Sequence, residues 1–159
     1  MRTKRGFVLI ELIVVLALFG ALIGLSSINL LGSRNSATIS STVDNVTSDL
    51  SSQQTKAMSS TTSAGGATPY GVRFESTRYI LFHGSVYNPS DSTNSVVPLS
   101  GGTTFSVINF PNASIIFASQ SGEVVGYNPS ASTVTVYQPG NFASKTISVN
   151  QYGIVTSVQ

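Results

Sequence analysis

The stretch RGFVLIE, residues 5–11, opens an apolar run that continues to about Leu31. Glu11 is the only charged residue within that run, and the next charge along the chain is Arg34. A carboxylate at the centre of a membrane helix costs roughly 2.5–3.5 kcal/mol to bury, so an ionisable residue in such a segment indicates a function. This stretch therefore decides both the predicted fold and the predicted role.

The length of the run and the charges before it predict a membrane helix. Residues 7–25 would form about 28 Å of α-helix, which matches the hydrocarbon core of a bilayer. Arg2, Lys4 and Arg5 precede the run and predict a cytoplasmic N-terminus by the positive-inside rule. Gly6 also stands before the run, whereas an ordinary secretory signal is cleaved after it, so we expect the mature chain to keep the helix. An uncleaved signal anchor is the alternative.

The segment KRGFVLIELIVVLALFGALIG, residues 4–24, resembles the N-terminal signal of type IV prepilins and type II secretion pseudopilins. The resemblance implies that a prepilin peptidase cleaves after Gly6 and that the new N-terminal residue, Phe7, is N-methylated. It also implies that the acid at the fifth mature position, Glu11, acts in filament assembly. Processing would remove three of the eight basic residues, so the formal net charge of +2 comes largely from the leader.

Elementary electrostatics gives Glu11 a partner in such a filament. Glu11 lies about 6 Å along the helix axis from the Phe7 amine that cleavage would create. In parallel subunits staggered along a filament, the carboxylate of one subunit can meet the amine of the next. Pairing stabilises both charges at low dielectric, although desolvation offsets part of the gain. The alternative is that Glu11 has no role in assembly and its side chain extends to the membrane surface.

Helical periodicity continues beyond the apolar run. Ile39, Val43, Val46 and Leu50 recur at steps of four, three and four, which predicts a buried stripe on one face of an α-helix. We therefore expect one long helix, apolar all round in its first half and amphipathic in its second. The expected organisation is a cleaved leader (1–6), a transmembrane half (7–31), an amphipathic half (32–58), a linker (59–69) and a β-rich head domain (70–159).

The head domain is expected to contain strands alone, because its apolar residues alternate with polar ones between turn-forming residues. The fold class that follows is α+β, with the long helix packed on a C-terminal antiparallel β-sheet in a pilin-like arrangement. The predicted strands are Tyr70–Glu75, Arg78–His83, Val96–Leu99, Thr104–Asn109, Ser114–Ala118, Glu123–Tyr127, Thr133–Gln138, Thr146–Asn150 and Ile154–Val158.

Several short stretches of the head resemble the GspH/FimT-type domain of minor pseudopilins and minor pilins. They are YGVRF (70–74), YILF (79–82), IIF (115–117) followed by Gly122, and ISV (147–149) followed by GIV (153–155). This resemblance implies a minor pseudopilin of a type II secretion system.

The composition offers little for catalysis or for metal binding. The chain has no cysteine and a single histidine, His83, and it lacks the nucleophile-elbow, zinc-protease and phosphate-loop patterns. Asp91 is the only acid between Gly84 and Gly102, which is poor support for a calcium site. We therefore expect no enzyme, no catalytic residue, no cofactor and no metal site.

Three cations in or beside the predicted strands offer a weak sign of nucleic-acid binding. Arg73, Arg78 and Lys145 could form a small basic patch of the kind that contacts DNA phosphates. Solvated strand faces explain three separated cations equally well, so nucleic acid is not an expected partner.

The function expected from these observations is that of a filament subunit without catalysis of its own. It would enter the cytoplasmic (inner) membrane by a single pass and then move into an extracytoplasmic pilus or pseudopilus. The resemblance implies as partners the prepilin peptidase, other pilin or pseudopilin subunits, an inner-membrane platform protein and an assembly ATPase. The alternatives are a pilin of a surface type IV pilus, serving adhesion, motility or DNA uptake, and a membrane-anchored binding module that does not polymerise.

Overall fold

The computed structural model describes residues 9–60, 66–140 and 142–159, with the side chains of 25–33 left out. By its internal contacts the chain divides into two compact units, Met1–Arg34 and Asn35–Gln159. The predicted cleavage site at Gly6 and Phe7 lies outside the described residues.

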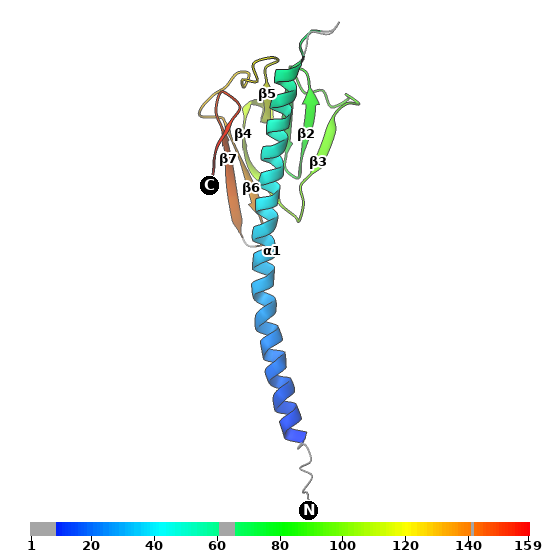
Figure 1. The fold of residues 1–159 in the computed structure, drawn as a ribbon, viewed down its shortest axis with the longest axis vertical. Helices are drawn as coiled ribbons and strands as arrows, with labels where there is room; N and C mark the ends of the chain where they lie inside the picture. The colour runs from blue at the N-terminus through cyan, green and yellow to red at the C-terminus, as the bar shows by residue number, and fades with distance from the viewer. Residues whose placement is uncertain (1–8, 61–65, 141) are drawn as a thin grey trace, which may run out of the picture. The chain divides into compact units, whose positions relative to one another are not determined.

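One helix, α1, precedes all the strands (Figure 1). The elements are α1 (Leu9–Ser59), β1 (Tyr70–Glu75), β2 (Arg78–His83), β3 (Ser95–Pro98), β4 (Thr104–Asn109), the short 3₁₀ helix η1 (Pro111–Ala113), β5 (Ser114–Phe117), β6 (Thr133–Gln138), β7 (Ala143–Val149) and β8 (Val155–Val158).

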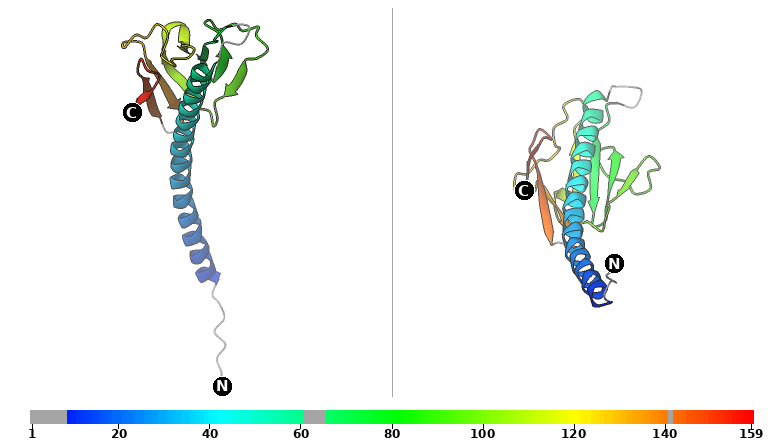
Figure 2. Two further views of the ribbon diagram at one scale, coloured as in Figure 1. Left: turned by 45° about the horizontal axis from the view of Figure 1, so that its top comes forward. Right: turned by 60° about the horizontal axis from the view of Figure 1, so that its bottom comes forward.

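The strands of the second unit form two antiparallel sheets. The first sheet has the order β3-β2-β1-β5 and the second the order β4-β6-β7-β8. In the first, the tight β1–β2 hairpin pairs Glu75 with Arg78, and β5 pairs with the other side of β1. The two sheets flank the helical portion from Asn35 onward on its two sides (Figure 2).

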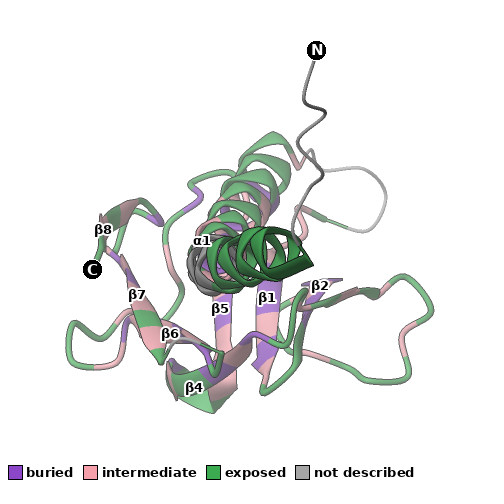
Figure 3. Ribbon diagram, turned by 90° about the horizontal axis from the view of Figure 1, so that it is seen from below, coloured by how far each residue is buried: buried purple, intermediate pink, exposed green. Residues whose placement is uncertain are grey.

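The helical stripe supplies the centre of the hydrophobic core. Ile39, Val43, Val46 and Leu50 are each no more than 3% exposed, as their spacing predicts. They pack with inward-facing residues of both sheets: Val72, Phe74, Ile115 and Phe117 from the first, and Phe105, Val134, Val136, Ile147 and Val149 from the second. Purple, buried segments are accordingly seen on β1 and β5, the strands beside the helix (Figure 3).

Aromatic rings join the two sheets beneath the helix. The Phe74 ring on β1 meets the Phe105 ring on β4 edge to face, with centroids 5.3 Å apart, and stacks on Phe110 at 5.5 Å. The backbone N–H of Phe105 also donates to the Ser76 carbonyl in the β1–β2 turn, at 2.9 Å. These contacts hold one edge of each sheet together, so the helix is packed into an angle between the sheets.

Polar groups tie the helix to both sheets as well. The Tyr79 hydroxyl on β2 donates to the Asp49 carboxylate of the helix at 2.6 Å, and Lys145 on β7 donates to the Ser40 hydroxyl at 3.1 Å. Gln54 donates to the carbonyls of Gly122 and Tyr152. These contacts fix the rotation and register of the helix, which apolar packing alone leaves less specified.

Most of the predicted strands are confirmed within a few residues. Those at Tyr70–Glu75, Arg78–His83, Thr104–Asn109 and Thr133–Gln138 agree in both bounds, and the weak segment Val96–Leu99 becomes β3. The strand predicted at Glu123–Tyr127 is wrong, because only the isolated bridge between Phe117 and Val124 forms there. Gly122 directly precedes this segment and Gly126 lies within it, with φ of +71° and +65°, and such left-handed backbone turns the chain out of a ladder.

The predicted arrangement of one long helix on one sheet needs correction, although the α+β class and the antiparallel pairing hold. The strands form two sheets, because the β4–β6–β7–β8 group closes its own ladder. The helix divides into two portions, 9–24 and 34–59. The side chains of the residues between them are not described, and the boundary between the two compact units in the sequence follows Arg34. The physical basis is that the stripe beginning at Ile39 has partner strands, whereas residues 9–24 are exposed all round.

Within the described residues, no helix has both the length and the apolarity that crossing a membrane requires.

Replacing Tyr79 with Phe tests the polar tie between helix and sheet. Burial raises the pKa of the Tyr79 hydroxyl above its ordinary value of 10.0, and the hydrogen bond to Asp49 adds to the effect. The substitution should lower the free energy of unfolding by roughly 1–3 kcal/mol at neutral pH, because it removes a hydrogen bond to a charged group.

The advantage of the native protein over Tyr79→Phe should shrink as the pH rises above about 10, where the tyrosine ionises in the unfolded chain but not in the folded one. Urea denaturation of both proteins between neutral pH and about pH 11 measures this, with the exposed Tyr152→Phe as the control. A constant difference across that range would contradict the assignment.

Candidate functional site

The first described portion of the helix presents apolar side chains on every side. All residues from 9 to 24 are exposed, with Leu9 at 74%, Leu16 at 62% and Ile23 at 66% (Figure 3). An amphipathic helix of a soluble domain would instead show one buried stripe. A patch of this extent marks a surface that other apolar groups cover in the functional state.

Glu11 occupies the first turn of this portion and is exposed. It is the only acid among residues 9–24. A carboxylate near a helix N-terminus is favoured by the helix dipole, and it can accept hydrogen bonds from an ammonium group. Its predicted partner, the Phe7 amine of another subunit, lies outside the described residues.

Two glycines of the same portion leave room for close packing. A Cβ built on Gly20 or Gly24 would meet no atom within 4 Å, so nothing within the described chain requires a glycine at either position. Small residues in apolar helices let neighbouring helices approach closely. The arrangement suits contact with a further helix.

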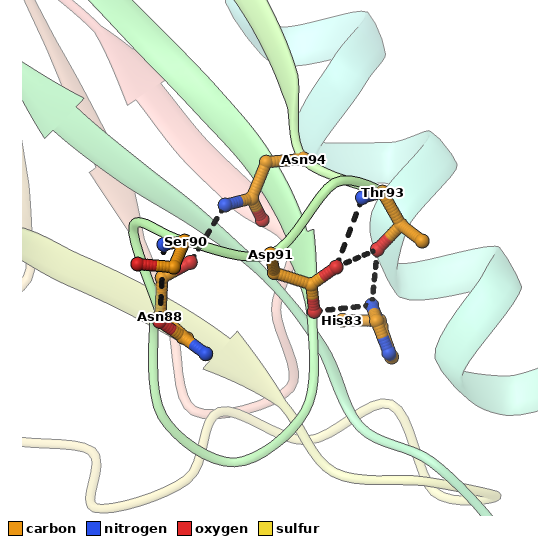
Figure 4. Close-up of polar contacts among 6 residues, drawn as sticks. All are labelled: His83, Asn88, Ser90, Asp91, Thr93 and Asn94. Carbon is orange, nitrogen blue, oxygen red and sulfur yellow. Dashed lines mark hydrogen bonds and ion pairs between the residues drawn. The ribbon is translucent and has the colours of Figure 1, made fainter.

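The only histidine, His83, is the last residue of β2 and contacts the hydrogen-bonded loop that follows (Figure 4). The Thr93 hydroxyl donates to Asp91 Oδ1 at 2.7 Å and lies 2.8 Å from His83 Nδ1. Because that hydroxyl has a single proton, which goes to Asp91, it accepts from the ring, and His83 Nδ1 carries a proton. Asp91 Oδ2 lies 3.6 Å from the same nitrogen.

This loop does not have the geometry of a nucleophile, base and acid. In such a triad the hydroxyl donates to one ring nitrogen of the histidine and the acid accepts from the other. Here the Thr93 hydroxyl donates to the acid, and both groups contact the same nitrogen of His83. The Asp91 carboxylate serves to close the loop, since it also accepts from the Thr93 backbone N–H at 2.9 Å.

Among the described residues, no group of three or more histidine, aspartate or glutamate side chains is placed to hold a metal ion.

The three cations considered for nucleic acid are each engaged separately. Arg78 pairs with Glu75 at 2.6 Å, and Lys145 on the other sheet donates to Ser40. Arg73 donates to the Asn112 carbonyl and lies over the Tyr87 ring, its Cζ 5.7 Å from the ring centroid. Because each cation has its own local partner, the three do not form a continuous basic surface that could follow a phosphate backbone.

A pocket of about 520 Å³ lies beside Arg73. The side chains around it come from β1, from the loop after β2, from β5 and from the segment that follows β5; they include Arg73, Tyr87, Ile116, Val125, Tyr127 and Asn128. The sequence shows Arg73 only as one cation in a strand. The pocket was missed because it joins segments that are more than fifty residues apart in the chain.

No protein-family model, no curated protein sequence and no solved structure matches this chain.

The amide of Thr93 should report the titration of Asp91. Hydrogen bonds from the Thr93 backbone N–H and hydroxyl lower the pKa of Asp91 below its ordinary value of 3.8. The closed loop should therefore persist as the pH falls past that value and open only when the carboxyl group is protonated, at a lower pH. Two-dimensional NMR would follow the Thr93 amide across the acid range.

The Ser130 amide is the matched control, because it donates to the neutral side chain of Asn128 in a different loop. It should not follow the same transition. A Thr93 midpoint at or above the ordinary value of 3.8, or an equal response at Ser130, would count against this account of the loop.

Proposed function

We propose that this protein is a structural subunit of a type IV pilus-like or type II secretion pseudopilus filament. The observation that carries the proposal is the N-terminal pattern: a basic leader ending in Gly6, then Phe7, then a single acid at Glu11 in an otherwise apolar run. The all-round exposure of apolar side chains in residues 9–24 supports it, because subunits packed side by side would cover them.

The proposed sequence of events begins in the cytoplasmic membrane. The apolar N-terminal segment inserts with its basic leader on the cytoplasmic side. A prepilin peptidase then cleaves between Gly6 and Phe7, and the Phe7 amine is methylated. A platform protein and an assembly ATPase move the mature subunit into the filament outside the cytoplasm.

Glu11 is proposed to select the correct axial position of each new subunit. A carboxylate among apolar helices is unfavourable unless it meets a cation, and the Phe7 amine of a neighbouring subunit is a cation at the matching depth. Only one stagger between parallel helices satisfies both charges. The pair therefore acts chiefly on register, while apolar contact along the helices supplies most of the association energy.

Within this class, a GspH/FimT-type minor pseudopilin is the proposed subgroup. Its support is the set of short motifs in the head and the elements that the structure describes after the linker, which are strands apart from the short 3₁₀ helix η1. We propose no catalysis for the head.

Glu11→Ala tests the assembly role. Cleavage and insertion should continue, because the peptidase acts before assembly, but recovery of the protein in sheared filaments should fall by at least about tenfold, given roughly 3–5 kcal/mol for an unpaired buried charge. Immunoblots of sheared and membrane fractions measure this. Glu123→Ala, which removes an exposed acid of the head, should assemble normally. Normal filament recovery for Glu11→Ala would refute the role of Glu11.

Gly6→Val tests the processing step. A side chain at this position should block close approach of the peptidase to the backbone, so the longer precursor should accumulate. Intact-mass and N-terminal peptide analysis of membranes distinguishes the two forms. Gly24→Ala lies beyond the cleavage site and should be processed normally. A methylated Phe7 terminus in Gly6→Val would rule out cleavage that depends on Gly6.

A further inference from the structure

The pocket beside Arg73 has the size and lining of a small-molecule site. Its volume of about 520 Å³ falls within the range of roughly 300–1,000 Å³ usual for ligand pockets. Aliphatic side chains form much of the wall, among them Val86, Ile116 and Val125, and the two tyrosines Tyr87 and Tyr127 add aromatic surface. The pocket lies wholly within the second compact unit.

Arg73 is the only charged residue among those that line this pocket. Its neighbours on β1, Val72 and Phe74, are buried in the core beneath the helix, so strand alternation turns Arg73 to the opposite face of the sheet. Within the described residues no carboxylate pairs with it, in contrast to Arg78, which pairs with Glu75. The pocket therefore has a positive charge without a counter-ion.

Contacts on two sides hold the Arg73 guanidinium in place. One terminal nitrogen, Nη1, donates to the Asn112 carbonyl, and the group lies over the Tyr87 ring. The Tyr87 ring is itself held edge to face by Phe82, with centroids 5.5 Å apart. Phe82 in turn lies across Gly71, where a Cβ would come within 2.6 Å of the ring. These contacts hold the guanidinium in one position, as a preorganised binding group requires.

The other edge of the guanidinium has unused donors. Arg73 Nε is shielded from solvent and has no hydrogen-bond partner. In a guanidinium, the Nε–H and one N–H of Nη2 point in the same direction, and together they match the two oxygens of a carboxylate. An unpaired buried donor costs free energy, so a small shift of the side chain that lets an acceptor in the pocket reach Nε would be favourable.

We propose that this pocket binds a small carboxylic acid with an apolar or aromatic body. The carboxylate would accept from the Nε and Nη2 edge of Arg73, and the body would lie against Val125, Ile116 and the tyrosine rings. Charge complementarity selects an acid over an amine, and the aliphatic wall selects an apolar body over a sugar. The site is independent of filament assembly, because it uses no residue of the N-terminal helical portion.

The test is NMR on the full-length protein in detergent micelles, labelled with ¹⁵N-arginine. The probe is 3-phenylpropionate, and 3-phenylpropionamide is the matched uncharged control. The Arg73 Nε–H signal should move saturably with the acid, with a dissociation constant on the order of millimolar for so small a ligand, and should not move with the amide. The Arg78 signal is an internal control, since its Nε is bonded to Glu75.

Two variants separate the site from the fold. Arg73→Lys keeps the charge but loses the bidentate edge, so the affinity measured on ligand signals should fall about tenfold. Val125→Asp places an acid at a position that is 54% exposed, where the fold should tolerate it, and should weaken binding by a similar factor through repulsion. Arg78→Gln should bind as the native protein does.

The proposal would be overturned by an equal response to the acid and the amide, which would indicate partition into micelles. It would also be overturned by no saturable movement of the Arg73 signal, or by full binding in both Arg73→Lys and Val125→Asp. None of these outcomes bears on filament assembly, which Glu11→Ala tests separately.

Discussion

The fold of the head depends on burial of one helical stripe between two sheets. Ile39, Val43, Val46 and Leu50 meet inward-facing residues from both sheets, and each is nearly inaccessible to solvent. Neither sheet packs face to face on the other as in a β-sandwich, so each needs the helix to cover its apolar face. Removing the helix would expose two sheet faces at once, which makes the second helical portion an integral part of the domain.

Polar contacts make this packing specific. Apolar side chains tolerate small rotations of a helix, whereas the hydrogen bond between Tyr79 and Asp49 and the bonds of Gln54 to two loop carbonyls do not. The close approach of the β7–β8 turn depends on Gly153, where a Cβ would come within 2.5 Å of the Gln54 amide. The polar groups of the helix are thus divided between the two sheets and hold it in one register.

Much of this could be predicted from local sequence pattern, and the main failures concern contacts between segments that are far apart in the chain. The stripe at steps of four, three and four and the alternation in Thr133–Gln138 are local signals, and both correspond to observed elements. The division into two sheets depends on which strand pairs with which, and the pocket depends on bringing β1 beside the segment after β5. The alternation of apolar and polar residues within one strand indicates neither its partner strand nor the pocket. The strand predicted at Glu123–Tyr127 failed for a separate, local reason, since Gly122 and Gly126 outweigh its β-forming residues.

The two units of the chain satisfy their apolar groups in different ways, and this difference bears on how a filament of such subunits would be stabilised. The second unit buries its stripe internally and needs no neighbour for that purpose. The described part of the first unit buries none of its side chains from 9 to 24. In the proposed filament, association energy therefore comes mainly from the first unit, while the head folds independently of assembly. A head that does not depend on its neighbours for folding can keep a preorganised group such as Arg73 for a separate ligand, because Arg73 lies on the face of β1 opposite the core residues Val72 and Phe74.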